Sequence, residues 1–180
     1  RLQVEHTITE EVTGVDLVQA QIALAAGRRL RDIGLDPAAP PPVLGFAIQW
    51  RINAETLDAE GNATPGSGTL HRFDLPAGPG VRVDTHGAAG ATPSPHYDTL
   101  LAKLIVHTRS PRFADALRRS QRALAECRID GVATNLALLQ ALAARPEMQV
   151  QQVHTRWLES VLPVLLDASK NIAGSVIPVS

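Results

Sequence analysis

The sequence predicts an α+β protein in which an antiparallel sheet is flanked by helices. Three observations indicate this class. A helical pattern lies near the start of the chain, strand-like runs between residues 45 and 108 follow one another without helices between them, and helical patterns return after residue 110. Helices and strands that are segregated along the chain are typical of α+β folds, whereas a parallel sheet requires a long crossover between successive strands.

The first helix is expected between Asp16 and Gly27. Asp16 is a typical N-cap residue, apolar residues follow it at helical spacing, and glycine commonly ends a helix. The stretch LDPAAPPPVLG then excludes regular structure, because proline has no backbone N–H to donate. We therefore divide the chain into residues 1–44, a domain at residues 45–167, and a linker or tail at residues 168–180.

The run GFAIQWRINAE predicts the first strand. Its side chains alternate between an apolar face (Phe46, Ile48, Trp50 and Ile52) and a polar face (Gln49, Arg51 and Asn53). Further strands are expected at TLHRF, VRVDTH and KLIVHT, each preceded by a turn-rich segment. The first strand therefore presents Arg51 on its polar side.

The last third of the chain predicts three helices. The run SPRFADALRRSQRALAEC suggests a helix capped by Ser110, with apolar residues near one face (Phe113, Ala116, Leu117 and Leu124). A second helix is expected from Thr134 to Leu142, and a third in HTRWLESVLPVLL in spite of Pro163. Cys127 is expected to be a small buried apolar side chain.

The composition excludes several classes of function. A net charge of −1 gives no electrostatic footprint for nucleic acid or for an anionic membrane, and no apolar run is long enough for a membrane span. The single cysteine excludes an internal disulfide framework and fits a cytoplasmic protein. His6 and His96 have no partners at metal-ligand spacing, so no metal site is expected.

The opening stretch RLQVEH places three different polar groups on one side of the chain. If the stretch is extended, Arg1, Gln3 and Glu5 share a face. A guanidinium fork and an amide suit a planar anion such as bicarbonate, and a carboxylate beside them can act as a base. The alternative is a solvated face whose ion pairs contribute little to stability, and the spacing alone favours this alternative.

A series of motifs raises the first interpretation above the second. RLQVEHTITEEVTGVDLVQAQIALAAG, RINAE, TPGSGTL, GVRVDTH, SPHYDTLLAKLIV and RIDGVATN occur in this order within residues 1–159. They resemble the biotin carboxylases, which are the ligase domains or subunits at the start of acyl-CoA, pyruvate and urea carboxylases. The resemblance implies a remnant of an ATP-grasp lobe, followed by the C-terminal α+β domain of that family.

The resemblance also implies a function. Biotin carboxylases use ATP and magnesium to activate bicarbonate, and they carboxylate biotin that is attached to a carrier domain. The phosphate loop, the ATP-binding lysines and the magnesium ligands of the family lie upstream of these motifs. The resemblance therefore implies a fragment that is inactive by itself, with the carrier domain and a carboxyltransferase as partners and a homodimer in the parent protein.

Five residues would form the bicarbonate site implied by the resemblance. Arg1, Gln3, the backbone of Val4 and Arg51 would bind bicarbonate, and Glu5 would remove its proton. Arg51 would also stabilise the negative charge on the biotin oxygen while the ureido nitrogen is deprotonated. Arg1, Glu5 and Arg51 are thus the expected catalytic residues.

Other residues receive weaker roles from the same resemblance. Tyr97 and Asp98 would lie near the biotin or orient an arginine, with packing of their loop as the alternative. Arg82 would lie at the dimer interface, with a surface ion pair as the alternative, and Thr155 would approach the nucleotide.

Three positions depart from the pattern of the family: Phe46, Gln49 and Pro79. Gln49 and Phe46 lie in the strand of Arg51, and Pro79 lies where the family often has an aromatic interface residue. Phe46 and Pro79 leave open a different class of function, namely a non-catalytic assembly or dimerisation module built on the same scaffold.

Overall fold

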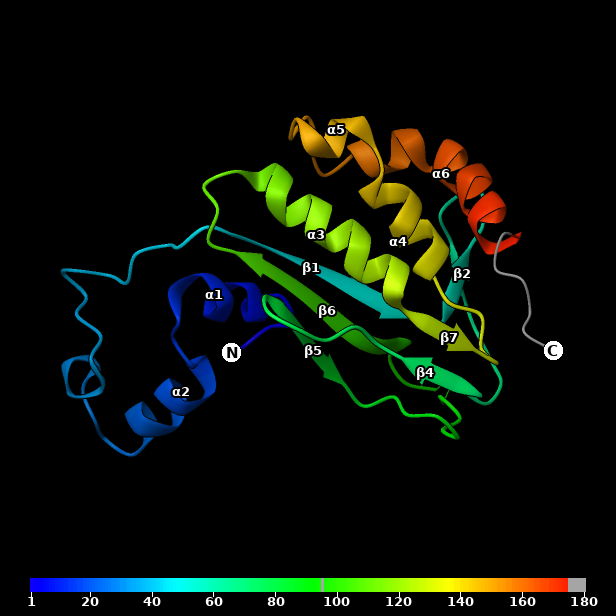
Figure 1. Cartoon of the computed structure of the whole chain (residues 1–180). Helices are drawn as coiled ribbons and strands as arrows, with labels where there is room; N and C mark the ends of the chain where they lie inside the picture. The colour runs from blue at the N-terminus through cyan, green and yellow to red at the C-terminus, as the bar shows by residue number, and fades with distance from the viewer. Residues whose placement is uncertain (95, 175–180) are drawn as a thin grey trace.

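The structure is a computed structural model that describes residues 1–94 and 96–174. It confirms the α+β class (Figure 1). The main sheet is antiparallel with the strand order β1-β6-β5, formed by β1 (Phe46–Asn53), β6 (Leu100–Thr108) and β5 (Val81–Thr85). Two small antiparallel sheets pair β2 (Glu55–Leu57) with β3 (Ala63–Pro65), and β4 (Arg72–Asp74) with β7 (Arg128–Asp130).

Helices lie on both sides of the main sheet (Figure 1). One face is covered by α3 (Phe113–Glu126) and α4 (Leu136–Ala143), with α5 (Pro146–Gln149) and α6 (Trp157–Gly174) further out. The other face carries α1 (His6–Thr13), from which α2 (Leu17–Ala25) and the short 3-10 helix η1 (Leu30–Ile33) extend away. The chain before β1 therefore lies against the face opposite α3.

The predicted alternation along β1 is confirmed. Trp50 and Ile52 are 4% and 0% exposed and belong to one core cluster with Leu104, Leu117 and Leu124. Each such side chain contributes on the order of 2 kcal/mol when it leaves water, and a shift of one residue would exchange the two faces of the strand. The core thus fixes the register that directs Arg51 toward the face of α1.

The expectation of an extended opening stretch is wrong. Residues 1–3 are irregular, residues 4–5 form a turn, and α1 begins at His6. The helix ends at Gly14, whose positive φ of 72° is accessible to glycine at little cost. The sequence pattern missed this helix because its buried residue, Thr7, is polar. Arg1, Gln3 and Glu5 are still the exposed members of residues 1–6.

The helix caps follow the predictions only in part. Asp16 is confirmed as the N-cap of α2, and its carboxylate accepts a hydrogen bond of 2.8 Å from the Gln19 N–H. Ser110 does not cap α3, which has Arg112 at its N-cap; the Ser110 hydroxyl instead donates to Asp115 inside the helix. Asn135 occupies the N-cap position of α4 without a capping bond from its side chain, and the hydroxyl of Thr134 accepts a hydrogen bond of 3.4 Å from the Leu136 N–H, the first of the helix.

The last helix contains Pro163, as predicted, and extends to Gly174. The expected tail at residues 168–180 is therefore helical over residues 168–174, and residues 175–180 lie outside the described part. Cys127 is confirmed as a buried side chain with 3% exposure at the end of α3. Within the described residues, no helix combines the length and the apolar composition that a membrane span requires.

Helix α2 forms as predicted, but its apolar side chains remain exposed. Val18 and Ile22 are 52% and 65% exposed, and no residue of α2 is buried. A helix of this length is marginal in isolation, so packing against other residues normally stabilises it.

Candidate active site

Arg51 lies near the end of an edge strand, between two buried residues. Trp50 and Ile52 are anchored in the core on one face of β1, so the Arg51 side chain projects from the opposite face. Its side chain is 50% exposed, and its cross-strand neighbour in β6 is Lys103. The guanidinium group is thus held by a rigid strand and is still accessible to a ligand.

Glu5 approaches Arg51 from the start of α1. It occupies the N-cap position of the helix, and its side chain makes no capping hydrogen bond. The Nη2 atom of Arg51 donates to the Oε2 atom of Glu5 over 3.4 Å, and the Glu5 side chain is 49% exposed. Exposed ion pairs contribute only about 0–1 kcal/mol, so this pair adds little to stability.

The remainder of α1 is fixed to the sheet by polar contacts. Thr7 donates its hydroxyl to the side chain of Gln49 on β1. Glu10 and Glu11 accept hydrogen bonds from the Arg82 Nη1 atom on β5, at 2.8 Å and 3.4 Å. Helix α1 therefore spans from β1 to β5, and these contacts set the position of Glu5 at its N-terminus.

A network of charges surrounds Arg82. Its Nε and Nη2 atoms bind both oxygens of Asp84, at 2.9 Å and 3.1 Å, and Lys103 lies 3.1 Å from the same carboxylate. Hydrogen bonding to Asp84 raises the pKa of the Arg82 guanidinium further. Burial acts to raise the pKa of Asp84, but the hydrogen bonds and charges of Arg82 and Lys103 outweigh burial and leave this pKa below its usual value.

The structure brings together only part of the predicted bicarbonate site. Glu5 and Arg51 meet, whereas the exposed side chains of Arg1 and Gln3 have no hydrogen bond or ion pair with any described residue. The backbone N–H of Val4 also has no hydrogen-bond partner within the described ranges. The unpaired donors of Arg1, Gln3 and Val4 therefore lie within four residues before Glu5 in the sequence.

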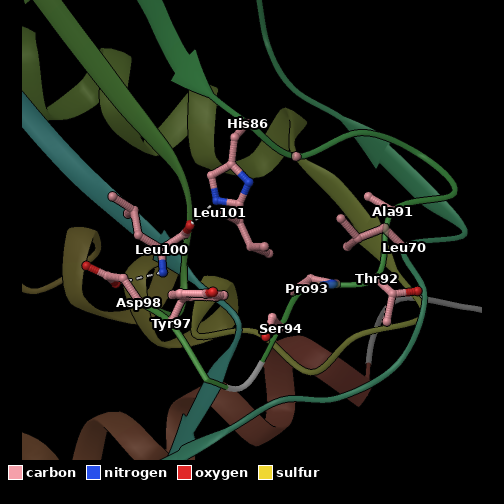
Figure 2. Close-up of a pocket in the computed structure, with 11 residues that line it drawn as sticks. Leu70, His86, Ala91, Thr92, Pro93, Ser94, Tyr97, Asp98, Leu100 and Leu101 are labelled. Atoms are coloured by element: carbon pink, nitrogen blue, oxygen red, sulfur yellow. Dashed lines mark hydrogen bonds between the residues drawn. The ribbon is translucent and has the colours of Figure 1, made fainter.

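Tyr97 and Asp98 line a different hollow, of about 400 Å³ (Figure 2). Tyr97 is 82% exposed, and the Asp98 carboxylate accepts a hydrogen bond of 2.9 Å from the Leu100 N–H. Figure 2 shows both residues at one side of the hollow and Leu70 at the other. Neither Tyr97 nor Asp98 contacts Arg51 through a hydrogen bond or ion pair in the described part of the chain.

The remaining predicted positions lie elsewhere. Thr155 is exposed in the turn before α6, and α6 lies on the side of the sheet opposite α1 (Figure 1). Pro79 is exposed in the turn before β5, and Phe46 packs edge-to-face against Phe113 with ring centroids 5.8 Å apart. Among the described residues, no group of three or more acidic, histidine or cysteine side chains is arranged to hold a metal ion.

Two features of this site were missed from the sequence. One is the attachment of α1 through Glu10 and Glu11, because the helix itself was not predicted. The other is Asn135, the last residue of RIDGVATN, which binds the backbone of β1 at Arg51 and Asn53. The motif can be seen in the sequence, but its contacts with residues more than 80 positions away cannot be predicted from the sequence alone.

Comparison with known proteins identifies the class that this fold and site define. The family model described as biotin carboxylase C-terminal domain matches residues 49–160, more than half of the 180 residues. Residues 1–33 match the model described as the ATP binding domain of the carbamoyl-phosphate synthase L chain. The chain belongs to the biotin carboxylase C-terminal domain family.

Individual relatives agree with this assignment. The biotin-dependent acyl-coenzyme A carboxylase alpha3 subunit of Mycobacterium leprae is 41% identical over 164 residues, which cover 89% of this chain and 26% of that protein. The biotin carboxylase domain of a single-chain bacterial carboxylase superposes with a TM-score of 0.84 at 48% identity, and the match covers 95% of this chain and 38% of that one.

A third relative was solved with ligands. The biotin carboxylase domain dimer of the 2-oxoglutarate carboxylase from Hydrogenobacter thermophilus, in complex with MgADP, ADP and bicarbonate, gives a TM-score of 0.80 at 37% identity over 92% of this chain and 35% of that chain. The chain thus spans between about a quarter and two fifths of the length of these relatives.

Proposed function

We propose that this chain supplies the bicarbonate-facing and biotin-facing residues of an ATP-dependent biotin carboxylase within a biotin-dependent carboxylase. The observation that carries the proposal is the meeting of Glu5 and Arg51, which are 46 positions apart in the sequence. A half-exposed acid and a half-exposed guanidinium on two anchored elements suit a reaction in which an anion is bound and a proton is removed.

Each group would have a separate task. The guanidinium of Arg51 carries five N–H donors, and Glu5 is the only partner of this guanidinium among the described residues, so further donors are available for an anion. The free N–H of Val4 and the side chains of Arg1 and Gln3 would add donors around bicarbonate. Glu5 would accept the proton when the O–H bond of bicarbonate breaks, and Arg51 would stabilise the negative charge that develops on the biotin oxygen.

The cofactors would be bound in part by other regions of the protein. These residues fit an anion site, whereas ATP and magnesium require phosphate-binding backbone and acidic ligands. When bound, ATP and magnesium would supply the activated form of bicarbonate. We propose that the 180 residues alone do not turn over, because the relatives carry most of their length outside the matched region.

The partners belong to the same proposal. Carrier-bound biotin would enter beside Arg51, with Tyr97 and Asp98 lining its approach, and a carboxyltransferase would receive the carboxyl group. Thr155 would face the nucleotide, and Arg82 would lie near a homodimer interface while also holding α1. The division at residues 1–44, 45–167 and 168–180 and a cytoplasmic location are likewise proposed.

Replacement of Arg51 by alanine in the full-length parent tests the proposal. We expect carboxylation of biotin to fall by at least about a hundredfold, as for the loss of one charge-stabilising group, while the oligomeric state is unchanged. The rival function is an assembly module, for which Phe46 and the exposed Pro79 before β5 are the motivating features. Altered assembly with intact carboxylation in R51A would support that rival and contradict the enzyme.

A further inference from the structure

The strand that carries Arg51 has one edge without a neighbouring strand. Among the residues that the structure describes, β1 pairs only with β6 in the main sheet, so the backbone groups on its other edge require other partners. Near Arg51 these partners come from one residue, Asn135. The Asn53 N–H donates to the Asn135 Oδ1 atom over 2.9 Å, and the Asn135 Nδ2 atom donates to the Arg51 carbonyl over 3.1 Å.

The backbone of Asn135 completes this attachment. Its N–H donates to the Asn53 carbonyl over 3.1 Å, so three hydrogen bonds join one residue to a short stretch of β1. The side-chain amide acts here like a peptide group of a missing strand, since it offers one acceptor and one donor to the edge. The backbone that follows the Arg51 side chain, from the Arg51 carbonyl to the Asn53 carbonyl, is thus fixed from outside the sheet.

The Asn135 side chain binds β1 instead of capping its own helix. Asparagine at an N-cap commonly accepts a hydrogen bond from the first turn of its own helix. At the N-cap of α4 the Asn135 side chain makes no such bond. Its amide is therefore committed to β1, and in the first turn of α4 the Leu136 N–H donates to the Thr134 hydroxyl over 3.4 Å instead.

The residues before Asn135 are equally constrained. Strand β7 pairs with β4, and Gly131 follows with a positive φ of 95°. A Cβ atom at Gly131 would lie 2.0 Å from the Thr69 carbonyl oxygen, so only glycine allows this close approach. A paired strand on one side and a packed helix on the other thus hold Asn135 against β1.

From this geometry we infer that Asn135 is a positioning residue for Arg51, which sets the backbone of β1 so that the guanidinium meets its ligand. The inference rests on the proposed function of Arg51. A displacement of about 1 Å in a catalytic group can cost a hundredfold in rate, so a residue that fixes the backbone at this point affects catalysis without touching the substrate. Asparagine is required because the site needs one donor and one acceptor at fixed spacing.

Two variants of the full-length parent test this inference. N135D keeps the shape and the acceptor for the Asn53 N–H, but it places a second acceptor opposite the Arg51 carbonyl. N135A removes both side-chain bonds. We expect either variant to lower kcat for biotin carboxylation by about tenfold, with KM for ATP changed less than twofold.

The matched control is Q140A. Gln140 lies on the same helix, and its side chain donates to the Leu124 carbonyl over 2.8 Å, away from β1. Hydrogen exchange of the segment around residues 51–53 should accelerate in N135A and stay unchanged in Q140A. Unchanged exchange in N135A would overturn the inference even if that variant lost stability or activity for another reason.

A double-mutant cycle separates positioning from general destabilisation. Arg51→Lys keeps a cation, and we expect it to keep measurable turnover, so N135A is compared in the wild-type and R51K backgrounds. If Asn135 acts through Arg51, the tenfold effect should shrink to about twofold or less in R51K. An equal effect in both backgrounds would overturn the inference, whereas an R51K variant and an R51A variant that both keep full activity would instead overturn the proposed function.

Discussion

The Nη2 atom of Arg51 lies 3.4 Å from the Oε2 atom of Glu5. This contact connects the end of the edge strand β1 with the N-cap of α1. Neither side chain is buried, and the pair contributes little to stability. The pair leaves an acid and a guanidinium close together and half-exposed to solvent. Such an arrangement suits the binding of a ligand better than the stabilisation of the fold.

Replacement of Glu5 by glutamine removes the base and keeps the shape of the side chain. Loss of a general base typically costs 10²–10⁴-fold, so we expect biotin carboxylation in the parent to fall by at least about a hundredfold with little change in KM for ATP. E60Q is the control, because Glu60 is exposed in the turn between β2 and β3 and its side chain has no partner among the described residues. Equal rates for E5Q and wild type would remove Glu5 from the chemistry.

The second prediction concerns the attachment of α1. Arg82→Met should accelerate hydrogen exchange in α1 and β5, because it breaks bonds to Glu10, Glu11 and Asp84 at once. Since the Arg82 side chain is 36% exposed, we expect a loss of only about 1 kcal/mol in local stability. R72M, which breaks the exposed pair of Arg72 and Asp74, should change exchange far less.

The same variant has a catalytic consequence. If α1 sets the position of Glu5, R82M should lower kcat while the parent keeps its oligomeric state at high protein concentration. A variant that changes only the oligomeric state would restrict Arg82 to the dimer interface and would show that α1 is held by its other contacts.

The third prediction follows from the lowered pKa of Asp84. A carboxyl whose pKa is lower in the folded than in the unfolded state contributes stability above its unfolded pKa of about 4, and it loses this contribution as the pH falls through the folded value. The wild type should therefore lose local stability of β5 below about pH 4 more steeply than D84N. Parallel pH profiles in hydrogen exchange would show that Asp84 titrates alike in both states.

The fourth prediction concerns Cys127. Burial raises the pKa of its thiol to about 12, so almost no thiolate exists at neutral pH. The peptide that carries Cys127 should resist alkylation by iodoacetamide in the native parent and react after denaturation, as followed by mass spectrometry. Rapid native labelling would mean that the end of α3 opens far more readily than its packing indicates.

The sequence predicts the core of this fold better than its edges. The alternation of β1 and the apolar face of α3 carry the strong periodic signal of buried side chains, and the structure confirms both. Helix α1 was missed because its residues contact the sheet through polar groups, and polar contacts leave no hydrophobic period. The short strands β2, β3 and β7 were missed because three residues are too few to show a period.

The site could be predicted as a set of residues but not as a geometry. The resemblance named Glu5 and Arg51, but the alternation argument placed Glu5 in an extended stretch, where the structure has a turn and the start of a helix. The exposed apolar residues Val18 and Ile22 on α2 could not be anticipated either, since a periodic pattern does not say what covers the face it predicts.

A crystal structure of the full-length parent with bicarbonate would show directly whether Glu5 and Arg51 bind the anion. We expect the anion to lie within about 3 Å of the Arg51 guanidinium, with an oxygen of bicarbonate near the Glu5 carboxylate and the Val4 N–H. Bicarbonate bound at another place, with Glu5 and Arg51 still paired to each other, would contradict it.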